Sequence, residues 1–486
     1  MLTKSWKEEC GVFGIWNHAE AARLTYLGLY AMQHRGQESA GIVTLEQTPL
    51  GSQHNIYKAL GLVSDIFNEE NLSKLKGQCG IGHVRYSTTG GNKIINAQPL
   101  TSELLNGPLA VAHNGNIVNS SVLKEALQRE GAIFQATNDT EVLLHLLAKN
   151  PSNDLVFALK DSLSNLIGAF SFVILSHNKL LAVRDPLGFR PLVLGQIKTD
   201  DRTSYVVASE TCAFDLIGAQ FIREIAPGEI LEISAEGLQS HYYVSQEAVK
   251  NGRKTAQCVF EHVYFARPDS VVFGRSVYGS RKKFGEQLAL ESPVAADVVI
   301  PVPDSGVPSA IGFSQQSGIP FEFGIIRNHY IGRTFIQPAQ SIRDIGVKIK
   351  LNPQPDVLKG KRVVVIDDSL VRGTTSQKII SLIRQAGATE VHLRVASPPT
   401  TGPCFYGVDT PQKSELIASQ NSIEDIRKYI GADSLAYLSE SGMWSALKSG
   451  PESFCAACFN GDYPTSLKSV ENKKNITEKT EKSPTQ

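Results

Sequence analysis

The segment Arg362–Ser376 (RVVVIDDSLVRGTTS) carries several groups that together could bind a phosphorylated sugar. Val363–Ile366 has the length and β-branching of a buried strand, and two adjacent acids, Asp367 and Asp368, follow directly. Carboxylates at a strand end can bind Mg²⁺ and accept hydrogen bonds from ribose hydroxyls. Thr374–Ser376 then opens a predicted helix that runs to about Gln385, and its first N–H groups could hold a phosphate. An isolated acidic pair would be interpreted as a solvated surface feature, but the whole string indicates a sugar-phosphate site.

This string resembles the phosphoribosyl-pyrophosphate motif of the type I phosphoribosyltransferases. Glycine in the turn lets the backbone approach a phosphate closely. The residues that the resemblance assigns to the ligand are Asp367, Asp368, Ser369, Arg372, Gly373, Thr374 and Thr375.

A second segment, Ala296–Gly306 (ADVVIPVPDSG), has the pattern of a buried strand followed by a turn. Such a turn can expose N–H groups to an anion, although an ordinary strand-to-helix turn has the same pattern. In the type I phosphoribosyltransferases this turn is the pyrophosphate loop. The resemblance therefore adds Asp304, Ser305 and Gly306 to the site, and it places Ser305 with Asp367 and Asp368 around one Mg²⁺ ion.

Cys10 follows nine residues that are mostly polar or charged, and it stands before a predicted strand, Gly11–Trp16. Taken alone, a cysteine in this position is usually a small buried apolar residue. Removal of residues 1–9 would give it another use, because the freed α-amino group has an ordinary pKa near neutrality and can act as the base for the thiol. We expect residues 1–9 to be such a propeptide.

Four polar strings follow Cys10 along the chain. They are Met32–Ile42 (MQHRGQESAGI), Gly80–Asn92 (GIGHVRYSTTGGN), Ala110–Asn119 (AVAHNGNIVN) and Thr137–Leu147 (TNDTEVLLHLL). In this order, behind a cysteine, they resemble the glutaminase domain of the N-terminal-nucleophile amidotransferases. The resemblance covers about residues 10–245. It implies antiparallel sheets covered by helices, in a four-layer α/β/β/α sandwich.

In that family a cysteine thiolate attacks the side-chain amide of glutamine and releases ammonia from a thioester, and Cys10 matches this nucleophile. Asn114 and Gly115 match the donors of the oxyanion hole. Arg85 matches the residue that pairs with the glutamine carboxylate, and Asp139 the one that receives its α-ammonium. Alone, Arg85 or Asp139 would be interpreted as half of a surface ion pair. The histidines in these strings have no task in this mechanism and are interpreted as structural: His34, His83, His113 and His145.

The apolar pattern lapses around Val244–Thr255, which is the candidate domain boundary. From about Cys258 strands and helices alternate, as is typical of a parallel sheet. We therefore expect a class II glutamine amidotransferase domain over residues 10–245 and a phosphoribosyltransferase domain over 258–467. The tail 468–486 is rich in Lys, Glu and Thr and is expected to be disordered.

Arg327–Pro353 is basic and shows neither strand nor helix periodicity. A stretch of that length without regular structure is usually functional or disordered. Ile331–Pro338 closely resembles the flexible loop with which the glutamine phosphoribosylpyrophosphate amidotransferases close over their ribose substrate and complete a conduit for ammonia. The resemblance thus adds Arg333 to the phosphoribosyl-pyrophosphate site. Closure would keep water away from the activated ribose.

Four further cysteines lie in the second half. A lone Cys-x-x-Cys pair such as Cys455 and Cys458 fits zinc, redox chemistry or no function, and the spacing of the other two adds nothing. The surrounding segments, however, match the cluster-ligand segments in one branch of the same family. The resemblance implies one [4Fe–4S] cluster, with a Cys₄ zinc site or plain thiols as alternatives. Its ligands would be Cys258, Cys404, Cys455 and Cys458, whereas Cys79 and Cys212 are interpreted as buried apolar residues.

Composition limits the classes of protein that this chain can belong to. A length of 486 residues suffices for two or three domains. Lys+Arg and Asp+Glu are equal at 48 each, so no global charge favours nucleic acid or an anionic membrane. No apolar run approaches the ~20 residues of a membrane span, and the N-terminus lacks the apolar core of a secretory signal. Seven cysteines in so long a chain do not indicate a disulfide framework, so we expect a reducing cytoplasm.

Both halves together resemble the glutamine phosphoribosylpyrophosphate amidotransferases over nearly the whole chain. The resemblance implies that glutamine, phosphoribosyl pyrophosphate and water give 5-phosphoribosylamine, glutamate and pyrophosphate, with ammonia passed internally, as the first step of purine synthesis. It also implies a homotetramer and feedback inhibition by purine nucleotides.

Two alternatives remain at this level. A hexosamine-phosphate synthase would share the first half but would lack VVVIDDSLVRGTTS. A non-catalytic sensor of phosphoribosyl pyrophosphate would have no reason to keep the glutaminase residues in register, and those residues are Cys10, Arg85, Asn114 and Asp139.

Overall fold

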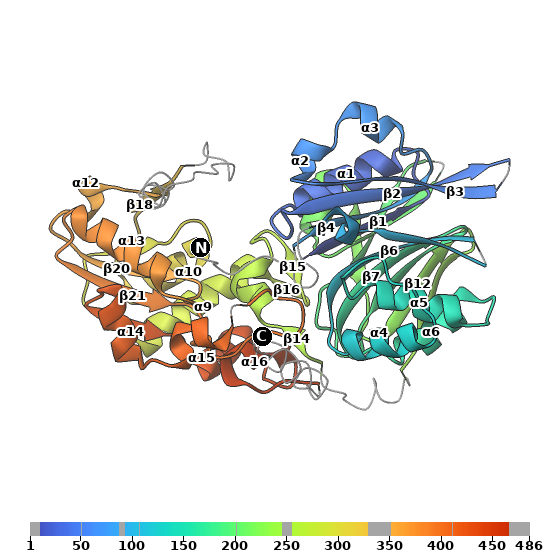
Figure 1. Ribbon diagram of the computed structural model, residues 1–486. Helices are drawn as coiled ribbons and strands as arrows, with labels where there is room; N and C mark the ends of the chain where they lie inside the picture. Colours follow the sequence, from blue (N-terminus) through green and yellow to red (C-terminus); the bar gives the residue numbers. More distant parts are fainter. Residues whose placement is uncertain are drawn as a thin grey trace, which may run out of the picture.

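The computed structural model describes residues 10–49, 51–86, 93–105, 107–200, 202–244, 255–328, 351–410 and 412–465. Within these ranges the chain forms two halves, an N-terminal half drawn in blue to green and a C-terminal half drawn in yellow to red (Figure 1). The predicted leader 1–9, the predicted tail 468–486 and most of the predicted domain boundary lie outside the described residues.

The N-terminal half is built on two antiparallel sheets. Within the described residues one sheet has seven strands in the order β11-β9-β10-β1-β4-β2-β3, and the other has six in the order β13-β12-β8-β7-β6-β5. The first sheet consists of β1 (Gly11–Trp16), β2 (Ser39–Thr48), β3 (Gly51–Leu60), β4 (Cys79–Arg85), β9 (Val193–Lys198), β10 (Thr203–Ala208) and β11 (Gln220–Glu224). The second consists of β5 (Leu100–Leu104), β6 (Gly107–Ile117), β7 (Gly168–Ser176), β8 (Lys179–Arg184), β12 (Glu229–Ser234) and β13 (Gly237–Tyr242).

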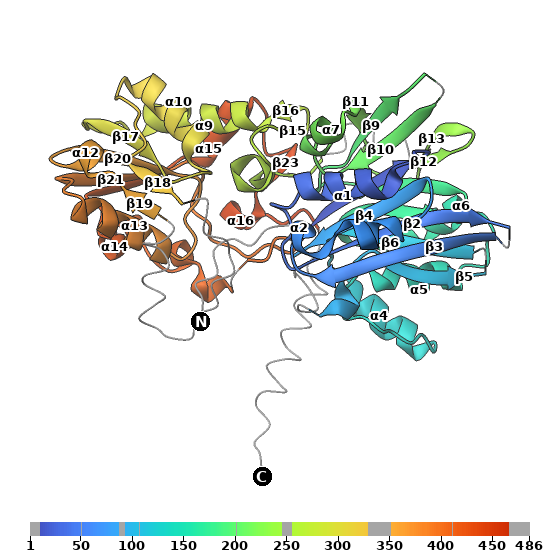
Figure 2. The same ribbon diagram turned by 90° about the horizontal axis from the view of Figure 1, so that it is seen from above.

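Helices cover the outer faces of both sheets. Helices α1 (Ala21–Ala31) and α7 (Cys212–Ile217) pack on the seven-stranded sheet, and α2 (Val63–Ile66) and α3 (Glu69–Ser73) lie nearby. Helices α4 (Ser120–Arg129), α5 (Glu141–Lys149) and α6 (Leu155–Leu163) lie over the six-stranded sheet (Figure 2). Between the sheets the alternate apolar side chains of both interdigitate, among them Val12 and Ile81 from one sheet and Ala110 and Val173 from the other. This arrangement confirms the predicted α/β/β/α sandwich.

The C-terminal half is organised around a parallel sheet, as the alternating pattern predicts. In the part of the chain that the structure describes, this sheet has four strands in the order β17-β20-β21-β22. They are β17 (Val298–Pro301), β20 (Arg362–Asp367), β21 (Glu390–Val395) and β22 (Ser434–Tyr437). One face packs on α9 (Val277–Glu291), α10 (Val307–Ser317) and α15 (Glu440–Leu447), and the other on α13 (Thr374–Gln385) and α14 (Ile423–Ile430).

Shorter elements complete this half. They are the pairs β14 (Gln257–Cys258) with β23 (Phe454–Cys455), β15 (Val271–Val272) with β16 (Arg275–Ser276) and β18 (Ile325–Arg327) with β19 (Leu351–Pro353), the helices α12 (Pro355–Leu358) and α16 (Ala457–Asn460), and a π-helical turn at Glu261–Phe265. Among the described residues no helix is long and apolar enough to span a lipid bilayer.

Buried ion pairs join the two halves. Arg35, in the turn after α1, pairs with Glu210 of its own half and bidentately with Glu261 of the second half, through Nη1 to Oε2 at 3.0 Å and Nη2 to Oε1 at 2.7 Å. Arg190 of the first half lies 3.6 Å from the same Glu261 carboxylate, and all four side chains are fully buried. Because removing one partner leaves a buried charge uncompensated, this network is a strong constraint on how the halves meet.

Candidate active site

Cys10 lies immediately before β1, which is the central strand of the seven-stranded sheet. The antiparallel pairing of β1 with β4 sets Gly11 opposite Val84, so the register brings Cys10 beside the end of β4. The Cys10 Sγ lies 3.5 Å from the carbonyl oxygen of Tyr86, and the Nε of Arg35 donates to the Cys10 carbonyl at 3.1 Å. The cysteine is buried and fixed on both sides, as a nucleophile must be if it is to attack with defined geometry.

The predicted oxyanion donors lie on β6, which contacts β1 across the two sheets. The Nδ2 of Asn114 is buried and has no hydrogen-bond partner among the described residues. A buried amide left unpaired costs about 1–3 kcal/mol, so this donor indicates a place for a ligand oxygen. Gly115 has φ +143°, and an added Cβ would lie 2.1 Å from the carbonyl oxygen of Ala169 on β7, so only glycine fits there.

Arg85 and Asp139 line the same region from two sides. Arg85 is buried at the end of β4, directly before Tyr86. The Oδ2 of Asp139 accepts from the backbone N–H of Ile117 at 2.7 Å, two residues after Gly115. Arg85 is thus adjacent to Tyr86, whose carbonyl contacts Cys10, and Asp139 binds the strand that carries Asn114 and Gly115. This arrangement suits a ligand that contacts both groups of residues. Residues 87–92, which complete the predicted motif after Arg85, lie outside the described residues.

Two of the histidines in this region have the structural character that the sequence predicts. The Nε2 of His83 donates to the carbonyl of His113 at 2.9 Å, and burial lowers the pKa of His83 to about 3. Burial also lowers the pKa of His113, against the opposing effect of Asp139. Burial thus favours the neutral form of both rings.

Arg35 is a functional residue that the sequence reasoning did not single out. It lies inside the matched string Met32–Ile42, and that string was the available signal. Its role depends on what its guanidinium contacts, namely the Cys10 carbonyl and the carboxylates of Glu210 and Glu261. These partners are 25 to 226 residues away in sequence, which no local pattern can reveal.

The second candidate site lies at the carboxyl ends of β17 and β20. These strands are parallel neighbours with Pro301 opposite Ile366, so the turn at Asp304–Gly306 comes directly beside the acid pair. The Ser305 side chain lies near enough to Asp368 to lower the pKa of that carboxyl, and the Oγ of Ser369 donates to Asp368 Oδ1 at 2.5 Å. The structure thus places the turn Asp304–Gly306 beside Asp367 and Asp368.

The electrostatics of the acid pair suit a divalent cation. Burial and the charge of Asp368 raise the pKa of Asp367 well above its usual range. Burial also raises the pKa of Asp368, although Ser305, Ser369 and the Arg281 guanidinium oppose this shift. A cation beside the two carboxylates would offset both the burial cost and their mutual repulsion. Ser305, Asp367 and Asp368 together offer the hard oxygen donors that Mg²⁺ prefers.

The part of the site that is predicted to bind phosphate begins at Gly373. This residue has φ +74° and is the N-cap of α13, and glycine has no side chain that could accept from the N–H groups of Thr374 and Thr375. Such a helix start favours an anion. Nearby Arg372 pairs with Glu415, and Arg327 pairs with Asp304 at 2.7 Å.

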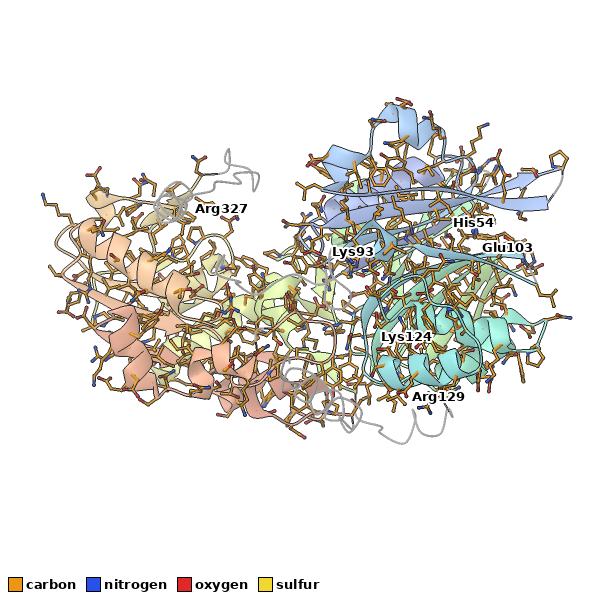
Figure 3. All side chains as sticks on the ribbon, in the orientation of Figure 1. His54, Lys93, Glu103, Lys124, Arg129 and Arg327 are labelled. Carbon is orange, nitrogen blue, oxygen red and sulfur yellow. The ribbon has the colours of Figure 1, made fainter. Side chains whose placement is uncertain are left out.

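The predicted loop that closes over the ligand is only partly covered by the structure. Arg333, which the sequence adds to this ligand, lies outside the described residues, as does the segment 329–350 around it. Figure 3 shows Arg327, just before that segment, on the second half of the molecule, and Lys93 on the side of the first half that faces it.

The four predicted cluster ligands line one small cavity where the halves meet. The parallel pair β14–β23 places Cys258 opposite Cys455. The backbone N–H of Tyr406 donates to the Sγ of Cys404 at 3.3 Å, and burial together with the neighbouring thiols raises the pKa of Cys458. Aromatic and apolar groups complete the wall: Phe189, Phe260, Tyr406, Val408, Ala457 and Tyr463.

The four cysteines offer a donor set of sulfur atoms alone. Within the described residues no three His, Cys, Asp or Glu side chains are grouped closely enough to hold one metal ion. Four soft sulfur donors around an apolar cavity are ligands that an iron–sulfur cluster or a Cys₄ zinc ion can take.

Comparisons with known proteins agree with both halves of the structure. A family described as a glutamine amidotransferase domain matches residues 83–215, and one described as a phosphoribosyl transferase domain matches residues 285–399. Over 458 residues the chain is 54% identical to the chloroplastic amidophosphoribosyltransferase of Vigna aconitifolia, covering 94% of this chain and 92% of that protein. Over 469 residues it is 48% identical to the amidophosphoribosyltransferase of Bacillus subtilis, covering 96% of both.

A solved structure extends this likeness to three dimensions. It is described as glutamine phosphoribosylpyrophosphate amidotransferase from B. subtilis complexed with ADP and GMP, and it superposes with a TM-score of 0.87 at 47% identity. The match covers 94% of this chain and 98% of that one. With this identity over nearly the full length, and with a glutaminase site and a ribose-phosphate site in one chain, the protein belongs to the amidophosphoribosyltransferase family.

Proposed function

We propose that this chain converts glutamine, phosphoribosyl pyrophosphate and water to 5-phosphoribosylamine, glutamate and pyrophosphate, the first step of purine synthesis. The observation that carries the proposal is the pairing of two sites in one chain. One half holds a buried cysteine and the Asn114 amide, whose Nδ2 has no hydrogen-bond partner among the described residues, and the other holds a buried acid pair shortly before a helix whose N-cap is glycine. Fully buried ion pairs join the two halves.

In the first site, removal of residues 1–9 would free the α-amino group of Cys10 to take the proton of its own thiol. Arg85 would bind the glutamine carboxylate and Asp139 the α-ammonium, so that the side-chain amide lies against the sulfur. As the thiolate attacks, the amide oxygen gains negative charge and accepts hydrogen bonds from Asn114 Nδ2 and the Gly115 N–H. Collapse releases ammonia and leaves a thioester, which water hydrolyses to glutamate.

In the second site, the turn at Asp304–Gly306 would bind the pyrophosphate and the start of α13 the 5-phosphate. The carboxylates of Asp367 and Asp368 would hold the ribose hydroxyls, and with Ser305 they would hold one Mg²⁺ ion. When bound, Mg²⁺ neutralises charge that develops on the departing pyrophosphate. The chain itself orients C1 of the ribose toward the incoming ammonia.

We further propose one [4Fe–4S] cluster per chain at the four cysteines that line the cavity between the halves. The proposal is supported by the four sulfur donors, which line one cavity with aromatic and apolar side chains around them. Since β14 pairs with β23, and the N–H of Cys258 donates to the carbonyl of Phe189 in the first half at 3.1 Å, a group held here would join the two halves.

The remaining assignments extend to partners and compartment. We propose feedback inhibition by purine nucleotides, supported by the B. subtilis relative that was solved with ADP and GMP. We also propose a homotetramer, which rests on the family resemblance alone. For the compartment we propose the cytoplasm, because no disulfide forms among the cysteines of the described residues. The V. aconitifolia relative is chloroplastic, and a reducing compartment is what the cysteines require.

The test is glutamate release from glutamine by anaerobically purified protein, with and without phosphoribosyl pyrophosphate and Mg²⁺. We expect strong stimulation by the two together, with pyrophosphate formed in equal amount. The matched variant is Cys10→Ser, which should lose glutamine-dependent synthesis but keep synthesis from added ammonia. Glutamate release that is indifferent to phosphoribosyl pyrophosphate would instead indicate a glutaminase with another acceptor.

A further inference from the structure

A segment of the second half, Cys404–Gly407, lies against the strand that carries the predicted oxyanion donors. Gly407 is buried, and a Cβ added to it would lie 3.0 Å from both the Cα and the carbonyl carbon of Gly115. The two glycine backbones are therefore in van der Waals contact, although 292 residues separate them. On its other side Gly115 is closed by β7, where an added Cβ would meet the Ala169 carbonyl at 2.1 Å. The Gly115 backbone is thus held between its own sheet and the second half.

Two polar contacts fix the same segment on the first half. The carbonyl of Phe405 accepts from the Nδ2 of Asn116 at 2.9 Å. The carbonyl of Tyr406 accepts from the Nε of the fully buried Arg190 at 3.0 Å. The Tyr406 ring also stacks on Phe189 with ring centroids 4.3 Å apart. Three consecutive residues of the second half therefore contact β6 and its surroundings. The contacts of Phe405 and Tyr406 fix the position of Gly407 against Gly115.

We infer that Gly407 is a positioning residue for the oxyanion hole, and that the glutaminase site is therefore complete only when the second half is docked. An oxyanion donor works only within about 2.7–3.1 Å of the developing charge, so a shift of a few tenths of an ångström in Gly115 weakens it. Gly407 does not touch glutamine and acts through the Gly115 backbone. The inference rests on the proposed function, because it needs Gly115 to serve as an oxyanion donor.

A second reason for glycine at this position must be separated from the first. Gly407 has φ +109°, a backbone angle that any other residue adopts with strain. Gly237 offers a matched control, since it has φ +106° and no described atom lies within 4 Å of an added Cβ. Gly461 offers another control close to the predicted cluster, with φ +77° and equally open space among the described atoms.

The experiment is steady-state kinetics of Gly407→Ala in the anaerobically purified full chain, with Gly237→Ala and Gly461→Ala alongside. We expect the kcat for glutamine-dependent synthesis to fall about 10- to 100-fold, because the lost interaction acts only in the transition state. The KM for glutamine and the rate with added ammonia should stay within about twofold. Inhibition by the γ-aldehyde analogue of glutamine, whose adduct with Cys10 places an oxygen in the hole, should weaken in parallel with kcat.

Several results of these measurements would overturn the inference. An unchanged kcat for glutamine, or an equal fall in the glutamine-dependent and ammonia-dependent rates, would overturn the inference. An equal loss in Gly237→Ala would also overturn it by assigning the effect to backbone strain. Should Gly407→Ala fail to fold, Asn116→Ala carries the same test, because it removes the Phe405 contact and should lower the same kcat selectively. A wild-type chain without glutamine-dependent synthesis would overturn the proposed function and this inference with it.

Discussion

Asn114 places two amide hydrogens at a buried position where no described residue accepts a hydrogen bond from its Nδ2. Such an atom destabilises the resting protein and becomes useful only when a substrate oxygen arrives. Asn119, five residues further along the chain, is fully used by contrast: its Nδ2 donates to the Asn165 carbonyl at 2.8 Å, and its Oδ1 accepts from the Ile167 N–H at 2.9 Å. We therefore expect asparagine to serve catalysis at position 114 and stability at position 119.

This contrast predicts opposite effects for the same substitution. Asn114→Ala should lower the kcat for glutamine-dependent synthesis by about 10²–10³ and leave the ammonia-dependent rate unchanged. Its free energy of unfolding should not fall, because an unsatisfied donor is removed. Asn119→Ala should instead lose about 1–3 kcal/mol of stability while keeping the kcat of the remaining folded protein. Kinetics and urea unfolding of both variants check the prediction, and a large stability loss in Asn114→Ala would contradict it.

At the residue scale, the sequence allowed the prediction of side chains whose chemical type suits catalysis or metal binding. Cys10, Asn114 and the pair Asp367-Asp368 stand in strings that few folds would need, so they could be predicted from short patterns. Arg35 and Gly407 could not be predicted in this way. An arginine is ordinary on any surface and a glycine in any turn, and their roles follow from contacts made across 25 and 292 residues of chain.

At the scale of elements, periodicity predicted the strands and helices whose spacing of apolar residues is regular. The strand Gly11–Trp16 has the predicted bounds, and the helix after the acid pair runs from Thr374 to Gln385 as expected. The pairing of β14 with β23 was not predictable, because two-residue strands carry no period. The π-helical turn at Glu261–Phe265 could not be predicted from the sequence either, although it positions Glu261 for its ion pair with Arg35 of the first half.

Glu210 holds several of these elements together. Its carboxylate accepts from the Ser270 hydroxyl at 2.7 Å and the Arg267 N–H at 2.9 Å, and it pairs with Arg35 and His34. Burial alone would raise the pKa of Glu210, but the charges of His34 and Arg35 outweigh burial and hold it well below its ordinary value of 4.5. A depressed pKa in the folded state means that the stabilisation is present above pH ~4.5 and is lost as the pH falls below it.

We therefore expect Glu210→Gln to be less stable than the wild type by on the order of 3 kcal/mol at neutral pH, since it leaves buried donors facing an amide. The difference in free energy of unfolding between the wild type and Glu210→Gln should stay constant down to pH ~5 and then decrease by about 1 kcal/mol by pH 4. Urea unfolding at pH 7, 5 and 4 measures it. Glu69→Gln is the control: Glu69 forms an exposed pair with Arg23 at 2.8 Å, and its loss should leave the free energy of unfolding almost unchanged at each pH. A gap of unchanged size at pH 4 would contradict the depressed pKa.

At the scale of the whole molecule, residues that join the two halves also contact residues of the predicted glutaminase site. Arg35 holds the Cys10 carbonyl and a carboxylate of the second half with one guanidinium. Cys404 lies three residues before Gly407, which contacts Gly115. The sequence could predict two domains and their order from the change in pattern near Cys258. It could not predict how they dock, because docking depends on surface complementarity between segments that share no local pattern.

This arrangement gives the predicted cluster a measurable structural effect. Cys455 lies on β23, which pairs with β14, and β14 is bonded through the Cys258 N–H to Phe189 of the first half. We expect Cys455→Ser to lack iron and sulfide in anaerobic preparations and to unfold at a lower temperature, with both halves destabilised together. Cys79→Ser, at a buried cysteine in the first half outside the predicted ligand set, should keep wild-type iron content. Wild-type protein that binds one zinc ion, or a Cys455→Ser variant that retains its iron, would show that the four thiols serve another purpose. Loss of iron with unchanged unfolding would instead show that the ion pairs of Arg35 suffice to hold the halves together.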